Sequence, residues 1–191
     1  LDGVRAVGDP QAETGDWTMT VDASTITQSG AVDIVGTHPG GLQIHSSTWR
    51  AAPETWLAAS GRHISPALDL WESEVELAGV NLAHNSEPST GSVLYACLSA
   101  GYTTLDLTDA LVTRCRLAID LAFDTQAEVR GTVDVVDAHR SGMYVREDAR
   151  LDISASGGVH LAHSGQQALG TGVTVEHGGT LVNEGALSTD G

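Results

Sequence analysis

Residues 102–124 read YTTLDLTDALVTRCRLAIDLAFD, and residues 126–148 repeat the same design as QAEVRGTVDVVDAHRSGMYVRED. At an offset of 24 residues six positions align well, and five of them are apolar in both stretches. The aligned pairs are Leu105 with Val129, Leu111 with Val135, Val112 with Val136, Cys115 with His139, Ile119 with Met143 and Leu121 with Val145. A cassette that recurs about every two dozen residues indicates a solenoid, because each repeat packs on the copies before and after it.

Apolar residues alternate within each cassette in runs of three to five residues, which Gly, Ser, Asn and Asp interrupt. This alternation predicts short strands joined by tight turns. The expected fold is all-β, a right-handed parallel β-helix with coils of about 22 to 30 residues, in which strands of successive coils pair. The third line of the repeat aligns Leu151 with Val129 at an offset of 22 and Val175 with Val145 at an offset of 30. The extra residues are expected in a turn at 163–172.

We expect one β-helix domain over residues 1–191, with irregular early coils in 1–71 and regular coils in 72–191. In segment 48–63, Pro53 precedes two alanines and Gly61, which predicts a short helical insert, with a long surface loop as the alternative. The sequence has neither a starting methionine nor a signal peptide, so we expect a fragment of a longer chain. We also expect end-to-end contact with further coils or with another chain, because the last repeat stops partway.

The chain carries 25 acidic and nine basic residues, with a formal net charge of −16. Nucleic acids and anionic membranes need a positive surface, so this balance argues against both as partners. Insertion into a membrane is not expected either, because no apolar stretch approaches 18 residues.

Two stretches resemble known β-helical families. VVDAHRSGMYVREDARLDI, at 135–153, is similar to the right-handed β-helix repeat proteins of the pectate-lyase-like superfamily. GVTVEHGGTLVNEGALSTDG, at 172–191, is similar to the β-helical autotransporter passengers and haemagglutinin-type surface proteins of bacteria. The resemblance covers roughly 72–191. It implies a structural or adhesive segment of a secreted or cell-surface protein, with a polysaccharide or a host or cell-surface molecule as ligand.

The same resemblance offers an enzyme as the alternative, a lyase, epimerase or glycoside hydrolase acting on an acidic polysaccharide. In lyases of this fold, carboxylates hold Ca²⁺ against the substrate and an Arg or Lys acts as base. Here Asp134 and Asp137, with Arg116 or Arg140, are the candidates. Only two or three carboxylates come together in this way, whereas calcium takes six to eight oxygen ligands. Exposed ion pairs are the simpler interpretation, so we assign no catalytic residue, and no cofactor beyond the Ca²⁺ that the enzyme alternative implies.

A second group of candidates lies in one corner column. The repeat places His84, Cys115, His139 and His163 on successive coils, about 4.8 Å apart. Imidazole and thiolate are ligands for zinc or copper. A ladder of polar residues at the turns is the alternative that we favour, because no closely spaced metal motif supports the site. Cys97 aligns with Leu121, in another column, so we expect two free thiols, with a disulfide as the alternative.

Two tryptophans, Trp49 and Trp56, are candidate ligand-binding residues, because exposed indole rings stack on sugars. Both lie where the repeat is broken. We therefore expect any local function at 49–63 or at 163–172.

Overall fold

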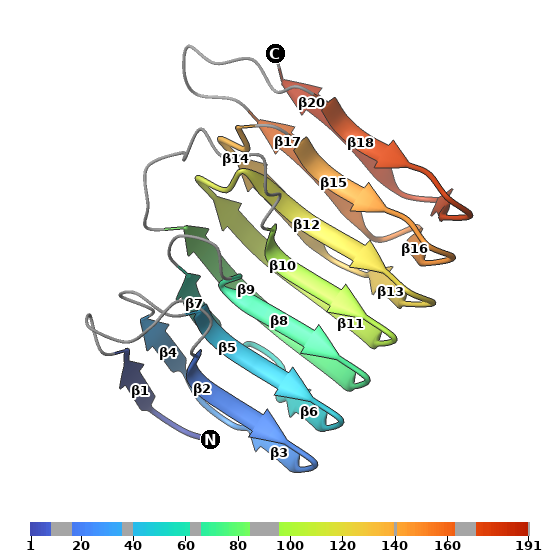
Figure 1. The fold of residues 1–191 in the computed structure, drawn as a ribbon. Coiled ribbons are helices and arrows are strands. Elements are labelled where there is room, and N and C mark those ends of the chain that lie inside the picture. The colour runs from blue at the N-terminus through green and yellow to red at the C-terminus, as the bar shows by residue number, and fades with distance from the viewer. Residues whose placement is uncertain are drawn as a thin grey trace.

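The computed structural model describes residues 1–8, 17–35, 40–61, 66–84, 96–139, 141–162 and 171–190. This part of the chain is an all-β parallel solenoid and contains no helix. Successive coils stack from the N-terminus to the C-terminus, as the colour gradient in Figure 1 shows. None of the described segments is therefore a helix that could cross a membrane.

Each coil contributes one strand to a seven-stranded sheet, which we call sheet B. Its strands are β2 (Trp17–Asp22), β5 (Gly40–His45), β8 (Leu68–Trp71), β10 (Ala96–Gly101), β12 (Leu117–Ala122), β15 (Ser141–Val145) and β18 (Thr171–Val175). All of its strand pairs are parallel.

The rest of each coil lies in a 13-stranded sheet, which we call sheet A. Short strands form its first half: β3 (Thr25–Gln28), β6 (Thr48–Ala51), β13 (Gln126–Val129), β16 (Arg150–Ile153) and β19 (Thr180–Asn183). Others form its second half: β1 (Val4–Val7), β4 (Val32–Val35), β7 (Leu57–Gly61), β14 (Thr132–Val136), β17 (Gly158–Ala162) and β20 (Ala186–Asp190). Two long strands, β9 (Glu74–His84) and β11 (Thr104–Thr113), run through both halves without a break.

The core consists of columns of apolar side chains, because every second residue of a strand points inward and the coils are in register. One column of sheet B contains Leu42, Leu68, Leu98, Ile119 and Met143, all of them buried. Each additional coil lengthens these columns, so the core grows with the number of coils. In the described part of the chain, the two sheets enclose it without a covering helix.

The corner between sheets B and A carries a ladder of buried hydroxyl groups. The Ser47 and Ser73 hydroxyls each donate to a carbonyl of their own coil and accept the amide N–H of the corner residue one coil before. Thr103 and Thr125 continue the ladder in the same way. The residue before each ladder position often has a positive φ, in the left-handed region of backbone conformations. Examples are Ser46, Glu72 and Tyr102. This hydroxyl ladder satisfies backbone N–H groups that the turn would otherwise leave buried without partners.

The predicted offset of 24 is correct between β12 and β15 of sheet B and wrong between the corresponding strands of sheet A. Ile119 pairs with Met143 and Leu121 with Val145, as expected. Leu105, however, pairs with Ala127 at an offset of 22. The difference arises because the later coil has one extra residue at each of two corners, near Gly131 and after Val136.

Two neighbouring pairs also differ from the prediction. Val112 pairs with Val135 at an offset of 23, one residue before the predicted Val136. Val129 pairs with Ile153 at an offset of 24, two residues after the predicted Leu151. A slip of two residues leaves an alternating pattern unchanged, so apolar matching cannot distinguish an offset of 22 from one of 24. The offset of 30 between Val145 and Val175 is confirmed. Most of the predicted insertion, 163–170, lies outside the described residues.

The helical insert predicted in segment 48–63 is wrong for its described part, 48–61. Strands β6 and β7 occupy this stretch, with a turn at Pro53 and Glu54. Trp49 and Leu57 are fully buried in the core columns of these two strands. Burial of large side chains on an alternating pattern stabilises the extended backbone, and this outweighs the local helix signal of Pro53. Residues 62 and 63 lie outside the described part.

Candidate functional site

An open groove lies on the outer surface of sheet A, where β9 and β11 run unbroken between interrupted strands. Its volume is about 560 Å³. The turn at 52–56 forms one wall, with Pro53, Glu54 and Trp56. The floor carries Glu76, Asp106 and Asp109, and Arg130 stands on the opposite side. We call this the Trp56 groove. It forms because the neighbouring coils have a turn where β9 and β11 have none.

Trp56 is positioned by the glycine that it covers. A Cβ atom on Gly79 would lie 2.8 Å from the Trp56 ring and 3.1 Å from the Thr55 carbonyl oxygen, so only glycine permits this approach. The turn itself is closed by the Thr55 hydroxyl, which donates to the Ala52 carbonyl. Trp56 remains 47% exposed. Its indole ring is therefore held in place and available to a ligand.

The other predicted tryptophan cannot bind a ligand. Trp49 has no exposed surface, and its indole N–H donates to the Gln28 side-chain oxygen at 3.2 Å. Trp49 and Trp56 thus lie on opposite sides of the same strand-turn-strand segment, one in the core and one at the surface. The prediction of a ligand-binding role for Trp49 is wrong, because its side chain falls on the inward face of β6.

The groove floor belongs to a longer ladder of carboxylates. Strand pairing places Glu76 next to Asp106, Asp106 next to Glu128, and Glu128 next to Asp152. Each of these acidic residues lies between two apolar ones in the sequence, as in VEL, LDL, AEV and LDI. The sequence pattern does not group these four residues, because the recurring motif forms a ladder only when the coils are set in the true register. Repulsion between like charges this close requires compensation by cations.

Arg130 supplies part of that compensation. Its guanidinium lies 2.9 Å from the Asp106 carboxylate and 2.9 Å from the Glu128 carboxylate. Burial nevertheless raises the pKa of Asp106; Arg130 opposes this shift, and Glu128 and Glu76 add to it. The Oδ1 atom of Asp106 is buried and has no hydrogen-bond partner among the described residues. Burial therefore favours the protonated form of Asp106 more than free solution would.

The predicted acid and arginine candidates that the structure describes, Asp134, Asp137 and Arg116, do not line this groove. Asp134 lies on the second half of sheet A, where its carboxylate is 3.4 Å from His160. Asp137 is a corner residue with a φ of 59°, and Arg116 lies in the connection between β11 and β12. Arg140 lies outside the described residues. The calcium arrangement that the resemblance implied gains no support from these positions.

His160 bridges three successive coils. Its ring lies 3.4 Å from Asp134 on β14 and 2.9 Å from Asp190 on β20. The hydrogen bond to Asp190 is the main cause of a raised pKa for His160, and Asp134 adds to it. A raised folded-state pKa means that this contribution to stability is complete below the unfolded-state value of about 6.5 and disappears as the pH rises through the folded-state pKa.

We therefore expect His160→Gln to lower the melting temperature at pH 5.5 and to have little effect at pH 8.5. Circular dichroism melts of both proteins at the two pH values measure this. An equal loss at both pH values would contradict the proposed role of the protonated imidazole.

The predicted metal column is only partly a column. The His139 amide donates to the Cys115 carbonyl at 2.8 Å, so these two residues stack as expected. Ala83 pairs with Thr113, which puts the backbone of His84 level with Arg114 and not with Cys115. His163 lies outside the described residues. No group of three or more His, Cys, Asp or Glu residues in the described part of the chain is arranged to hold a metal ion.

Cys115 is also unavailable as a thiolate, because it forms a disulfide with Cys97. The expectation of two free thiols is wrong. Strand pairing puts Cys97 between the pairs Ala96–Leu117 and Leu98–Ile119, level with Ala118, which follows Cys115 by three residues. The Cα atoms are 5.8 Å apart, within the range for a disulfide. Alignment with Leu121 failed because the true offset between these strands is 21 residues.

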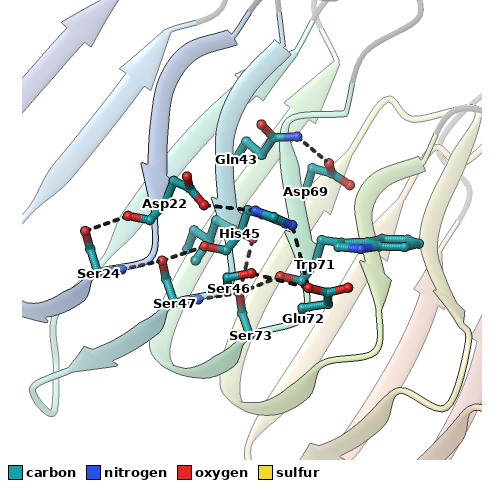
Figure 2. A network of polar contacts seen from close by, with 11 residues as sticks. Asp22, Ser24, Gln43, His45, Ser46, Ser47, Asp69, Trp71, Glu72 and Ser73 are labelled. Atoms are coloured by element: carbon teal, nitrogen blue, oxygen red, sulfur yellow. Dashed lines mark hydrogen bonds and ion pairs between the residues drawn. The ribbon is translucent and has the colours of Figure 1, made fainter.

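A second polar cluster lies on the outer face of sheet B (Figure 2). His45 Nδ1 is 2.9 Å from Asp22 Oδ1, and His45 Nε2 is 3.8 Å from Glu72 Oε2, so this histidine also spans three coils. Beside it, the Gln43 side-chain amide donates to Asp69 at 3.2 Å. Burial raises the pKa of Asp69, and the hydrogen bond from Gln43 partly offsets this. These contacts tie the outer surface of neighbouring coils together.

Comparison of the chain with protein-family models, with curated proteins and with solved structures found no match. The resemblance to pectate-lyase-like and bacterial surface proteins is therefore supported only at the level of the parallel β-solenoid that the strand pairing defines.

Proposed function

We propose that this β-solenoid is a carbohydrate-binding segment of an extracellular or cell-surface protein, and that a neutral glycan binds in the Trp56 groove. The observation that carries the proposal is the fixed, half-exposed Trp56 ring beside a floor of carboxylates. Sugar rings have apolar faces that stack on indole and hydroxyl groups that hydrogen-bond to carboxylates. The groove offers both in one place, as ligand sites commonly do.

The charge of the groove favours a neutral ligand. Four carboxylates, Glu54, Glu76, Asp106 and Asp109, line the groove together with Arg130, which is already paired with Asp106. Glu76 is also 3.9 Å from Arg50, so both nearby arginines are engaged. An acidic polysaccharide would be repelled by this surface. Binding of a neutral glycan is thus better supported than the alternative of an enzyme acting on an acidic polysaccharide.

The disulfide supports an extracellular location. Disulfides persist in oxidising compartments and are rare in the reducing cytosol. The bond between Cys97 and Cys115 joins two neighbouring coils and leaves no free cysteine among the described residues. This agrees with a protein that functions outside the cell or at its surface.

Contact with further coils or with another chain at the C-terminal end is also part of the proposal. Val175 and Leu187 pair with the core residues Val145 and Val159. Yet Val175 is 43% exposed and Leu187 is 39% exposed. Exposed members of a core column are what a further coil would cover.

The test is calorimetric titration of the chain with neutral hexasaccharides of the β-1,4, β-1,3 and α-1,4 glucan types. We expect one class to bind, and Trp56→Ala to weaken its binding at least about fivefold, because truncating a central tryptophan commonly costs more than about 1 kcal/mol. Trp56→Phe keeps an aromatic face and should retain most of the affinity.

Tyr102→Ala serves as the matched control, because Tyr102 is equally exposed but lies at the corner between sheets B and A. It should leave glycan binding unchanged. Binding of none of these glycans, or equal loss in the Trp56 and Tyr102 variants, would overturn the proposal.

A further inference from the structure

Three aromatic side chains from three successive coils meet on the outer side of the corner between sheets B and A. Trp71 packs edge-on against Tyr102 and Phe123, with ring centroids 5.3 and 5.6 Å apart. Tyr102 and Phe123 are stacked, at 5.5 Å and an interplanar angle of 17°. We call these three residues the aromatic platform. Tyr102 is 48% exposed, so one part of the platform is open to solvent.

Small residues make room for the platform. Trp71 pairs with Gly101, and Gly101 pairs with Ala122 on the next coil. A Cβ on Gly101 would lie 2.4 Å from the Trp71 ring, so the indole lies across a position that only glycine can occupy. The indole thereby reaches Phe123, two coils further on. The small residues Gly101 and Ala122 thus allow the three rings to pack together on the outer surface.

The molecule already places one cation on this platform. The Arg146 guanidinium carbon lies 5.9 Å from the centroid of the Phe123 ring, a cation–π distance. Asp120 holds the same guanidinium with two hydrogen bonds of 3.0 Å, and Glu147 accepts a third at 2.6 Å. The stack therefore runs from Arg146 to Phe123 to Tyr102, and its far end is the exposed ring.

Carboxylates border that exposed end. Glu72 occupies the same corner position as Tyr102 one coil earlier, because Trp71 pairs with Gly101. Its side chain is 55% exposed and lies beside His45. Asp69 lies on the same face, two residues before Trp71. The chain as a whole carries a net charge of −16. An aromatic face bordered by carboxylates, on a chain of strongly negative net charge, attracts a cation and repels an anion.

We propose that the aromatic platform binds a guanidinium group of a basic polypeptide partner, against Tyr102 and beside Glu72. The Arg146 arrangement on Phe123 is the internal example of the same contact. The incoming cation would occupy the free end of the stack as Arg146 occupies the other. This inference does not depend on glycan binding in the Trp56 groove, which lies on sheet A.

The experiment is an NMR titration of the whole chain with N-acetyl-arginine amide, following the Tyr102 ring and Trp71 indole protons. N-acetyl-citrulline amide, which has the same shape but no charge, is the matched control probe. We expect saturable shifts with the arginine probe at millimolar concentration and none with the citrulline probe. Tyr102→Leu should weaken binding at least about threefold, and Tyr102→Phe less than twofold, because only the aromatic face is needed.

Glu72→Gln should also weaken binding, by about twofold to fivefold. Leucine and phenylalanine meet the same backbone requirement at Tyr102, whose φ is 51°, so circular dichroism should show both variants folded alike. If Tyr102→Leu and the unaltered chain bind the arginine probe with equal affinity, the net negative charge of the chain alone attracts the probe, and the proposal is overturned. Equal binding of the citrulline probe would show that the positive charge is not recognised, and would also overturn the proposal. Binding of a neutral glycan at Tyr102 would overturn it in favour of a sugar site.

Discussion

Replacing Trp49 with alanine is expected to lower the free energy of unfolding by about 3–5 kcal/mol, the range for a buried aromatic residue. Trp49 has no exposed surface and is the largest fully buried side chain among the described residues. Its removal also leaves the Gln28 side-chain oxygen without its indole donor. Gln28 in turn donates to the carbonyls of Gly30 and Trp56, so the loss affects the turn that shapes the groove wall.

Urea denaturation followed by circular dichroism measures this effect as a lower transition midpoint at an unchanged slope. Trp56→Ala is the matched control, since it removes the same side chain seven residues later from an exposed position. That change should cost less than about 1 kcal/mol. Similar losses in the two variants would contradict the assignment of one ring to the core and one to the groove.

Removing the disulfide is expected to have an effect of similar size. Cys97 and Cys115 are separated by 18 residues, and a cross-link that closes a loop of this length contributes about 3 kcal/mol. Both cysteines are buried. The double variant Cys97→Ala, Cys115→Ala should therefore melt about 6–12 °C lower, because each kcal/mol corresponds to about 2–4 °C in a chain of this size.

Reduction of the unaltered chain should lower the melting temperature by a similar amount, and a reductant should have no effect on the double variant. Mass spectrometry before and after alkylation reports whether the bond is present. If the unaltered chain is alkylated at both cysteines without reduction, or if the double variant melts at the same temperature, the disulfide is not a stabilising cross-link.

Local function was expected where the repeat is broken, and the first such place is the one that shapes the groove. The turn at 52–56 projects because its coil needs a connection that β9 and β11 lack. The second place, at 163–172, lies largely outside the described residues. The aromatic platform, in contrast, lies within the regular coils. Trp71, Tyr102 and Phe123 are far apart in sequence, and each looks like an isolated corner or strand residue.

The sequence by itself determined the fold class, because alternation of apolar residues and recurrence about every two dozen residues are local properties of the chain. It also indicated the offset of 30 residues between Val145 and Val175, since these two positions can be matched without knowing the structure. It could not determine the register of sheet A, where Leu105 has equally good apolar partners at 22 and 24 residues. A shift of two residues preserves the inward face, so only the lengths of the corners decide between them.

Features that depend on the exact stacking of the coils, in either sheet, were left to the tertiary structure. The pairing of Cys97 with Cys115, the acidic ladder through Asp106 and the burial of Trp49 follow from which residue of one coil lies on which residue of the next. A register error of one residue moves a side chain from the core to the surface. An error of two residues keeps it on the same face but places it beside a different neighbour. The repeat thus predicts the scaffold, whereas the groove and the aromatic platform depend on contacts between coils that only the packed structure specifies.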